Sequence, residues 1–444
     1  MQRATGLAGF LSKHLPFYYG WVVVAVGFIT LGLGYTARST FSLLFSPILD
    51  EFGWDRGTTA LVYTIGFASA ALYAPLIGHW LDRYGPGVVL PFGTALVSAG
   101  FILTTMSTEI WHFVIALGAL VVGASTLLAF NAHFIIIPNW FEARRGFALG
   151  LCATGTGVIS VVALPLFQEI IDTQGWRASC YIFGVILMVV VFPLTALLQR
   201  RRPADLGLNP DGIATRAGMR GANVSPLRVV DEAWANTEWT LVRAAGTARF
   251  WLLSLAAASA LFVWYAIVVH QTRYLLDLGF DSALAALALG AVPMCGVIGQ
   301  IGFGWLADRI GREWVWTISV GGFAVCCGLL LLLEHDRSIL LVYAMVVAQG
   351  LLGNALVTVY GSAPADIFQG RNYGVIFGTI AIAGNLGAAV GPWVYGYLYD
   401  LSGTYAEALW LSIAMCGVSI ISMWFAAPRK VRSVRRLRKR KRGR

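Results

Sequence analysis

Charged residues are scarce in this sequence. Only 12% of its 444 residues are Asp, Glu, Lys or Arg, whereas 58% are hydrophobic, and the mean hydropathy is +0.72. A soluble domain of ordinary composition is about 25% charged. This composition excludes a soluble globular fold, and the sequence predicts an all-α membrane protein that crosses the bilayer many times.

Several chemical signatures are missing as well. The six cysteines lie within apolar runs and form no CxxC or Cys/His spacing, so we interpret them as small core residues. No Walker sequence or other phosphate-binding glycine loop occurs. The first apolar run is long enough to span and lacks an A-x-A-like site, so we expect no cleavable signal peptide. We therefore predict that the protein is not an enzyme and has no catalytic residues, metal site or cofactor.

Twelve apolar runs are long enough to cross a bilayer, which takes about 20 residues per helix. They form two groups of six, at 18–45, 57–80, 87–107, 110–138, 146–169 and 176–198, and at 249–272, 283–306, 314–333, 338–363, 373–398 and 405–427. The stretch between the groups is rich in Arg, Pro, Gly and Asp. We therefore predict an N-terminal bundle (1–199), a cytosolic linker (200–248), a C-terminal bundle (249–428) and a basic cytosolic tail (429–444).

The distribution of positive charge predicts the orientation. If both termini are cytosolic, the inner segments hold 27 of the 32 Lys and Arg residues, the outer loops hold four, and Arg38 alone lies within a span. The tail "RKVRSVRRLRKRKRGR" is expected to bind anionic lipid rather than nucleic acid. We therefore expect a multi-pass protein of the plasma membrane, such as a bacterial inner membrane, with both termini cytoplasmic.

The two halves of the chain repeat each other. "GHWLDRYG" begins at Gly78, between spans 2 and 3, and is matched 226 residues later by "GWLADRIG", which begins at Gly304, between spans 8 and 9. "FEARRGFALG" begins at Phe141 and is matched 227 residues later by "FQGRNYGVIFG" at Phe368. Internal duplication of a six-span unit is typical of many secondary transporters.

Twelve spans, a central linker and G-x-x-x-D-R-x-G in both the 2–3 and 8–9 loops resemble the major facilitator superfamily. The resemblance covers nearly the whole chain. It implies two pseudo-symmetric six-helix bundles, a central cavity lined by spans 1 and 7, and a protein that works as a monomer. We interpret the loop charges as gates that pair with neighbouring helix ends in one conformation and separate in the other. The predicted gating residues are Gly78, Asp82, Arg83, Gly85, Arg144, Arg145, Gly304, Asp308, Arg309, Gly311 and Arg371.

Three further stretches resemble the monocarboxylate transporter family and its bacterial oxalate–formate relatives. They are "YYGWVVVAVGF" at the start of span 1, "WFEARRGFALGLCATGTG" at 140–157 and "RRPADLGLNPDG" at 201–212. The resemblance implies small organic anions as substrates, often moved together with a proton. Charged residues that such relatives carry within spans 8 and 11 are absent here, which leaves the exact anion and the coupling ion open.

Arg38 lies in the apolar stretch "LGLGYTARSTFSLLF", where an unpaired guanidinium is costly. Tyr35, Arg38 and Ser42 share one helical face by their spacing. The resemblance places a substrate-binding basic residue at about this point, and an arginine can donate two parallel hydrogen bonds to a carboxylate. We predict that Arg38 and Tyr35 bind the substrate anion. The alternative is a structural arginine that snorkels outward or binds backbone carbonyls.

Three more polar residues within spans are predicted to bind substrate. They are Asn131 and His133 in span 4 and His270 near the outer end of span 7. The alternative role for such residues is to hold helices together. No Asp or Glu lies deep in a span, so His270 and His133 are also the candidate proton carriers. Otherwise the proton travels with the substrate.

Taken together, these features predict a secondary active transporter that works by alternating access. Its predicted cargo is a small organic anion, such as the monocarboxylates lactate or pyruvate, with proton symport. The alternatives are an exchanger for dicarboxylates of the oxalate–formate type, or a carrier of this fold for another cargo. A non-transporting membrane sensor is the alternative from a different class.

Overall fold

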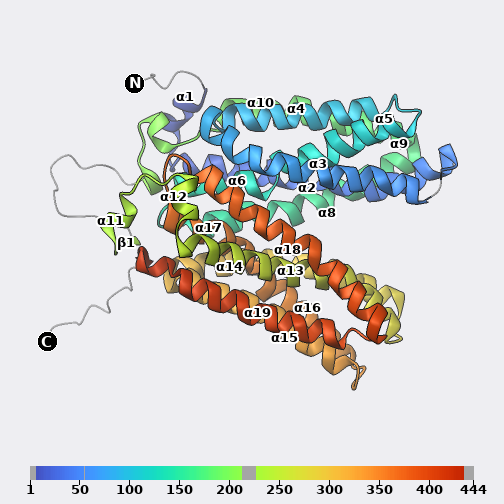
Figure 1. Cartoon of the computed structure of the whole chain (residues 1–444). Coiled ribbons are helices and arrows are strands. Elements are labelled where there is room, and N and C mark those ends of the chain that lie inside the picture. The colour runs from blue at the N-terminus through green and yellow to red at the C-terminus, as the bar shows by residue number, and fades with distance from the viewer. Residues whose placement is uncertain (1–6, 55, 213–226, 435–444) are drawn as a thin grey trace.

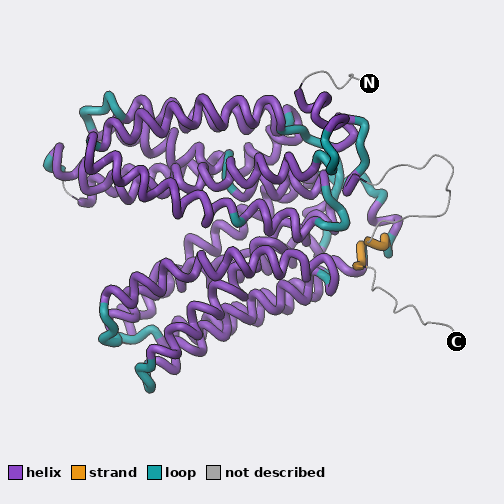
Figure 2. The backbone as a smooth tube through the Cα atoms, turned by 180° about the vertical axis from the view of Figure 1, so that it is seen from behind, coloured by secondary structure: helices purple, strands orange, loops and turns teal. Residues whose placement is uncertain are grey.

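The computed structural model shows a helical protein made of two bundles (Figure 1). The structure describes residues 7–54, 56–212 and 227–434. The bundles meet at the end of the molecule that carries α1 (Leu7–His14), the linker elements and β2 (Arg432–Val434), and their ribbons diverge toward the opposite end (Figures 1 and 2). We call these two ends the linker end and the open end.

Six spanning segments form the N-terminal bundle. The first three segments are single helices: α2 (Gly20–Phe52), α3 (Arg56–Tyr84) and α4 (Pro86–Thr104). The fourth segment consists of α5 (Ile110–Phe113), η1 (Val114–Gly123), η2 (Ala124–Leu127) and α6 (Phe130–Trp140). The fifth consists of α7 (Arg145–Ala153) and α8 (Gly155–Gln174), and the sixth of α9 (Trp176–Ile186), η3 (Leu187–Val191) and α10 (Phe192–Leu198). Gly85, with φ of 78°, separates α3 from α4. Its lack of a side chain permits this backbone conformation, and Pro86 then opens α4 at a position that needs no backbone donor.

Six further segments form the C-terminal bundle. Five of them are single helices: α13 (Ala248–Asp277), α14 (Ser282–Ile310), α15 (Arg312–Leu333), α18 (Tyr373–Ser402) and α19 (Ala406–Ala426). The tenth segment, between α15 and α18, consists of α16 (Ile339–Val347), η6 (Ala348–Leu352), η7 (Gly353–Ala355) and α17 (Leu356–Phe368). Gly311, with φ of 107°, separates α14 from α15. Gly85 also has a positive φ at the equivalent position in the first half, so the repeated motif produces a repeated turn.

Eleven of these segments are long and apolar enough to cross a membrane within the described residues. The helix α3 stands where the second span was predicted, which gives the expected twelve segments. The predicted boundaries were too short in places: span 1 was predicted to end at 45, whereas α2 continues to Phe52, and span 2 was predicted to end at 80, whereas α3 continues to Tyr84. These extra turns carry polar residues beyond the apolar stretch, so hydropathy alone does not detect them.

The fourth and tenth segments depart from α-helical geometry at equivalent places. Both contain a π segment followed by a 3-10 turn, η1 and η2 in the first half and η6 and η7 in the second. In the fourth segment the helix then breaks at Ala129, which is extended (φ −82°, ψ −170°), and α6 starts afresh at Phe130. Such irregular turns inside helices are often found at functional sites.

The linker packs against the bundles. Its described elements are η4 (Pro203–Leu206), η5 (Pro210–Gly212), β1 (Leu227–Val229), α11 (Glu232–Ala235) and α12 (Leu241–Ala245), and η8 (Pro428–Lys430) precedes β2 in the tail. Strands β1 and β2 pair antiparallel, with Arg228 opposite Ser433. The linker and the start of the tail are therefore joined, while tail residues 435–444 lie outside the described residues.

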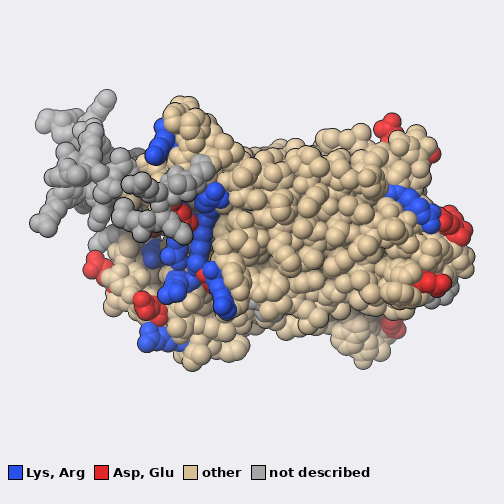
Figure 3. Space-filling view, turned by 90° about the horizontal axis from the view of Figure 1, so that it is seen from above, with Lys and Arg blue, Asp and Glu red and all other residues tan. Residues whose placement is uncertain are grey.

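Charged side chains gather at the two ends of the molecule. Figure 3 shows Lys and Arg concentrated at the linker end, a few charges at the open end and a broad belt without charge between them. An apolar belt of this kind is the surface that a bilayer would cover.

Candidate functional site

Asp308 joins the two bundles at the linker end. It lies near the end of α14, and its Oδ1 and Oδ2 accept hydrogen bonds from the N–H groups of Gly146 and Phe147, each at 2.9 Å. These N–H groups belong to the first turn of α7, where backbone donors have no partner within the helix and the helix dipole is positive. Asp308 therefore caps a helix of the opposite bundle.

Asp82 makes the corresponding contact between the other pair of helices. It lies near the end of α3, and its Oδ2 accepts a hydrogen bond from the N–H of Val375, at the start of α18, at 3.1 Å. Arg201 of the linker lies 3.4 Å from Asp82 Oδ1 and donates to the carbonyl of Arg371 at 3.2 Å. The contact thus joins the N-terminal bundle, the linker and the C-terminal bundle.

Glycines let the helices approach closely enough for these bonds to form. A Cβ atom added to Gly78 would lie 2.2 Å from the carbonyl oxygen of Gly374, and one added to Gly146 would lie 2.5 Å from that of Gly304. Both gaps are too short for any side chain. The glycines at the start of the repeated motif, Gly78 and Gly304, are therefore positions where the two bundles touch backbone to backbone.

A buried ionic network surrounds Asp308 and joins the two bundles. Arg312 lies 2.5 Å from Asp308 and 3.0 Å from Asp366, and Asp366 also forms an ion pair with Arg145 of the opposite bundle. Arg145, Asp366 and Arg312 are all buried. Arg145 and Asp308 were predicted to gate, but Asp366 and Arg312 were missed. The sequence did not single them out, because charged residues are common near the ends of membrane spans. In addition, the residue equivalent to Asp366 in the first half is the neutral Asn139, so the repeat did not mark this position.

Four other predicted gate arginines lie on the surface of the linker end. The guanidinium of Arg83 lies over the ring of Tyr84, and that of Arg309 lies over the ring of Trp305. Arg144 and Arg371 are also exposed. None of these four side chains takes part in an ion pair among the described residues. Arg145 is thus the buried, ion-paired arginine of the predicted set, whereas these four arginines are exposed.

The three stretches that carry the narrower family resemblance meet at one place on the linker end. The hydroxyl of Tyr18 donates to the carbonyl of Trp140 at 2.9 Å. Asp211 Oδ2 accepts hydrogen bonds from the N–H groups of Glu142 and Ala143 at 2.9 and 2.8 Å. The start of span 1, the 4–5 loop and the first part of the linker are therefore fastened together as one unit of the N-terminal half.

Arg38 lies on α2, toward the open end. Its guanidinium carbon is 3.8 Å from the centre of the Phe67 ring on α3, a cation–π contact. The side chain is half-buried, and no ion pair to it occurs among the described residues. An arginine in this position has a stabilising aromatic neighbour and no described counter-charge.

Tyr35 is the tyrosine near this arginine. It also lies near Tyr63 of α3 and Tyr265 of α13 in the opposite bundle. Tyr265 in turn lies near Tyr360 of α17. Tyr35 faces the other bundle and is still 48% exposed, so side chains do not fill the space between the bundles at this level.

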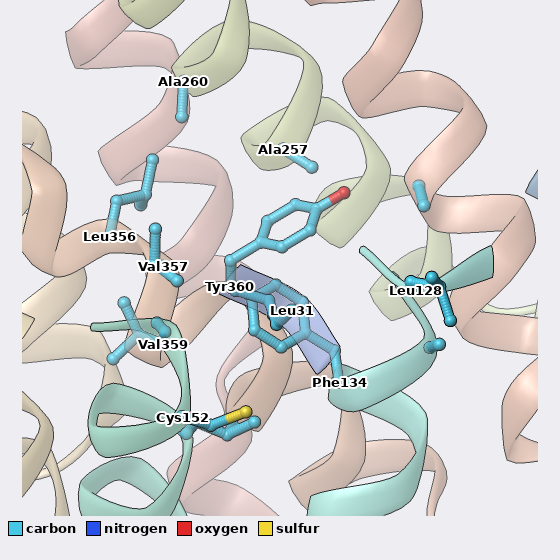
Figure 4. Close-up of a cluster of buried hydrophobic side chains, with 14 of the residues drawn as sticks. Leu31, Leu128, Phe134, Cys152, Ala257, Ala260, Leu356, Val357, Val359 and Tyr360 are labelled. Atoms are coloured by element: carbon cyan, nitrogen blue, oxygen red, sulfur yellow. The ribbon is translucent and has the colours of Figure 1, made fainter. Parts of the chain in front are cut away.

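An apolar layer closes that space on the side of the linker end. Figure 4 shows Phe134 of the N-terminal bundle and Tyr360 of the C-terminal bundle in one cluster of buried hydrophobic side chains, which also includes Leu31 and Leu128. The ring of Phe134 lies 5.9 Å from that of Tyr360 and 6.0 Å from that of Phe377. This apolar layer therefore also connects the two bundles.

His133 and Asn131 lie on α6. His133 is 1% exposed, and its Nε2 lies 2.7 Å from the hydroxyl of Thr30 while its Nδ1 lies 3.1 Å from the carbonyl of Ala129. It is thus packed between α2 and α6 of one bundle. Asn131 is half-buried in the first turn of α6, and the described residues offer its side chain no hydrogen bond.

His270 lies within the C-terminal bundle. Its Nε2 is 2.9 Å from the carbonyl of Pro392 and its Nδ1 is 3.2 Å from the hydroxyl of Tyr405. The structure therefore brings Arg38 and Tyr35 together but places His133 and His270 in separate bundles. No group of three potential metal ligands occurs in the described part of the chain.

Comparison with known proteins identifies relatives along almost the whole chain. The family model described as the Major Facilitator Superfamily matches residues 27–336 and 255–443. Monocarboxylate transporter 13 of Bos taurus is 25% identical over 396 residues, covering 88% of this chain and 85% of that protein. Monocarboxylate transporter 11 of Homo sapiens is 27% identical over 405 residues, covering 89% and 80%.

Solved structures share the fold at low sequence identity. The E. coli fucose:proton symporter FucP has a TM-score of 0.66 at 14% identity, covering 91% of this chain and 98% of that one. A structure of FucP in the outward conformation has a TM-score of 0.68 at 14% identity, with 92% and 99% covered. The human organic anion transporter MFSD10 has a TM-score of 0.65 at 16% identity, with 91% and 99% covered.

The ionic network yields a stability prediction. Asp366→Asn leaves Arg145 and Arg312 without their shared carboxylate, and removal of one partner from a buried ion pair costs about 3–5 kcal/mol. We expect a lower free energy of unfolding and a lower melting temperature for the purified protein. The matched control is Asp400→Asn, at an exposed position on α18. Equal melting temperatures for the two variants would contradict the assigned role of the network.

The glycine contacts yield a conformational prediction. Gly374→Leu places a side chain where the bundles touch, so the linker ends should separate. We expect a longer distance between spin labels on Phe10→Cys and Val242→Cys, at exposed sites on α1 and α12. The control is Gly321→Leu, where an added Cβ would meet no atom within 4 Å. If both variants retain the wild-type distance, the contact does not set the closed state.

Proposed function

The chain belongs to the major facilitator superfamily, and on this premise we propose that it moves small organic anions by proton-coupled alternating access. The proposed substrates are monocarboxylates such as lactate or pyruvate. The observation that carries the proposal is Arg38, a half-buried arginine on α2 that lies over the ring of Phe67 and has no described counter-charge. The names of the monocarboxylate transporter relatives support the same class of substrate.

The surroundings of Arg38 suit a carboxylate. A guanidinium fork can donate two parallel hydrogen bonds to one carboxylate, and a bound anion would remove the cost of an unpaired charge in a membrane. The hydroxyls of Tyr35, Tyr63 and Tyr265 are neighbours from both bundles and could donate to the same ligand. An anion held by groups from both bundles would favour the conformation in which the bundles come together around it.

The break in the fourth segment adds a second favourable feature. A Cβ added to Gly34 would lie 2.7 Å from Cβ of Leu128, which places the break close to the residue before Tyr35. The first backbone donors of α6 follow directly after this break. Discontinuous membrane helices direct such positive helix ends toward anionic substrates in other transporter folds. We assign Asn131, in the first turn of α6, to the same site.

The orientation follows from the charge distribution. With the basic linker end in the cytosol, the described conformation is open to the outside and closed toward the cytosol. Transport would require the Asp82 and Asp308 contacts to break while the open end closes. We assign the protein to the plasma membrane, as a monomer whose basic tail binds anionic lipid.

Arg38→Gln tests the substrate site. Loss of one charge-assisted pair costs about 1.5–3 kcal/mol, so the rate of uptake of labelled lactate into proteoliposomes at low substrate should fall by about ten- to a hundred-fold. The control is Arg273→Gln, an exposed arginine paired with Asp277. Wild-type uptake by Arg38→Gln would refute the proposed role of Arg38. If the wild type moves no lactate, labelled oxalate in exchange mode tests the dicarboxylate alternative.

Histidine variants test the coupling ion. A proton carrier must exchange protons with water, and His270 is half-buried whereas His133 is fully buried. We therefore expect His270→Gln to lose stimulation of uptake by an inward proton gradient, and His133→Gln to retain it. If both variants keep the full pH dependence, neither histidine carries the proton and it travels with the substrate.

A further inference from the structure

A pocket of about 320 Å³ lies at the linker end, on the seam between the two bundles. Small-molecule sites span about 300–1,000 Å³. The N-terminal bundle contributes Asn139 to its wall, the C-terminal bundle contributes Gln369, Gly370 and Arg371, and the rest comes from the linker. The linker residues are Arg202, Pro203, Ala204, Leu208, Asn209 and Pro210. The pocket therefore exists only while the bundles are closed at this end.

Positive charge dominates the pocket wall. Arg202 and Arg371 are its charged lining residues, and neither guanidinium joins an ion pair among the described residues. Arg201 lies beside them: desolvation lowers its pKa, the positive charges of Arg202 and Arg371 lower it further, and Asp82 and Asp205 oppose the shift. Three arginines thus converge on a place where two carboxylates are near.

A neutral donor also lines the pocket. The Oε1 atom of Gln369 accepts a hydrogen bond from Arg145 at 2.9 Å, which orients the carboxamide. Its Nε2 donates no hydrogen bond within the described part of the chain. Two guanidiniums and an oriented amide are the donors that oxyanions such as phosphate prefer.

We propose that this pocket is a regulatory site for a small cytosolic oxyanion of the phosphate class. The anion would bridge Arg202, which is fixed to the N-terminal half through the linker, and Arg371 of the C-terminal half. The pocket shares no lining residue with the Arg38 region. This inference needs the cytosolic orientation but does not depend on the identity of the transported substrate.

The consequence follows from linkage. A ligand that binds one conformation better than another shifts the population toward that conformation. An oxyanion in this pocket binds only when the linker end is closed. It would therefore hold the protein in the described conformation and slow the return of empty carrier through the state open to the cytosol.

The first test measures binding of inorganic phosphate to the purified full-length protein in detergent by titration calorimetry. The variants are Arg202→Gln and Arg371→Gln, with Arg243→Gln as control, because Arg243 is an exposed linker arginine outside the pocket. We expect each pocket variant to raise the dissociation constant by about ten-fold or more and the control to leave it unchanged. Arg371→Lys should recover part of the affinity.

Three results would overturn the proposal. They are absence of phosphate binding to the wild type, binding that persists in both pocket variants, or an equal loss in the control. A lipid phosphate has the same chemistry, so the titration is repeated in nanodiscs of neutral and of anionic lipid. Competition by anionic lipid would assign the pocket to a headgroup and overturn the assignment to a free anion.

The second test reads the conformation and does not depend on transport. Spin labels on Phe10→Cys and Val242→Cys report the separation at the linker end. Phosphate should reduce the population with the longer distance in the wild-type background, and it should have no such effect with Arg371→Gln. A distance distribution that phosphate leaves unchanged, in protein that binds phosphate, would refute the regulatory role.

Discussion

The bond between a carboxylate of one bundle and the first turn of a helix in the other is the contact on which this conformation depends. Asp308 makes it with α7 and Asp82 makes it with α18. Both bonds require backbone-to-backbone contact, which only glycine allows at these positions. The bundles diverge away from this end (Figure 1), and Tyr35, the neighbour of Arg38, remains 48% exposed.

The proposed gate, which consists of the Asp82 and Asp308 contacts, and the proposed substrate site involve opposing electrostatic costs. Opening the linker end exposes the capped helix ends and separates the Arg145–Asp366 ion pair, whereas closing the open end around an empty Arg38 would bury an unpaired charge. A bound anion removes only the second cost. In this account, substrate decides when the transporter can change conformation because it neutralises one charge, and the gate resists the change because its own charges are already paired.

The sequence alone predicted the fold, since long apolar runs and a repeated G-x-x-x-D-R-x-G loop motif are local signals. It also selected Asp82 and Asp308, whose motif positions recur, and Arg145, whose counterpart in the second half is the neutral Asn372. It missed Asp366 and Arg312 because a charge near a span end resembles ordinary loop charge until the partner is known. It could not place His270 or His133, because the face that a helix turns toward its neighbours depends on tertiary packing. Tertiary packing also brings span 1, the loop between spans 4 and 5, and the linker together around Tyr18 and Asp211. The sequence identified each of these stretches but not their contact.

The most direct test of this account is the distance between the open ends of the two bundles in the presence and absence of substrate. Thr173 and Ser402 are exposed residues at the open ends of α8 and α18, and spin labels on Thr173→Cys and Ser402→Cys would report their separation. The account predicts that a saturating small carboxylate shortens this distance in the wild-type background and fails to do so with Arg38→Gln. A distance that lactate, pyruvate and oxalate all leave unchanged, or that shortens equally without Arg38, would contradict it.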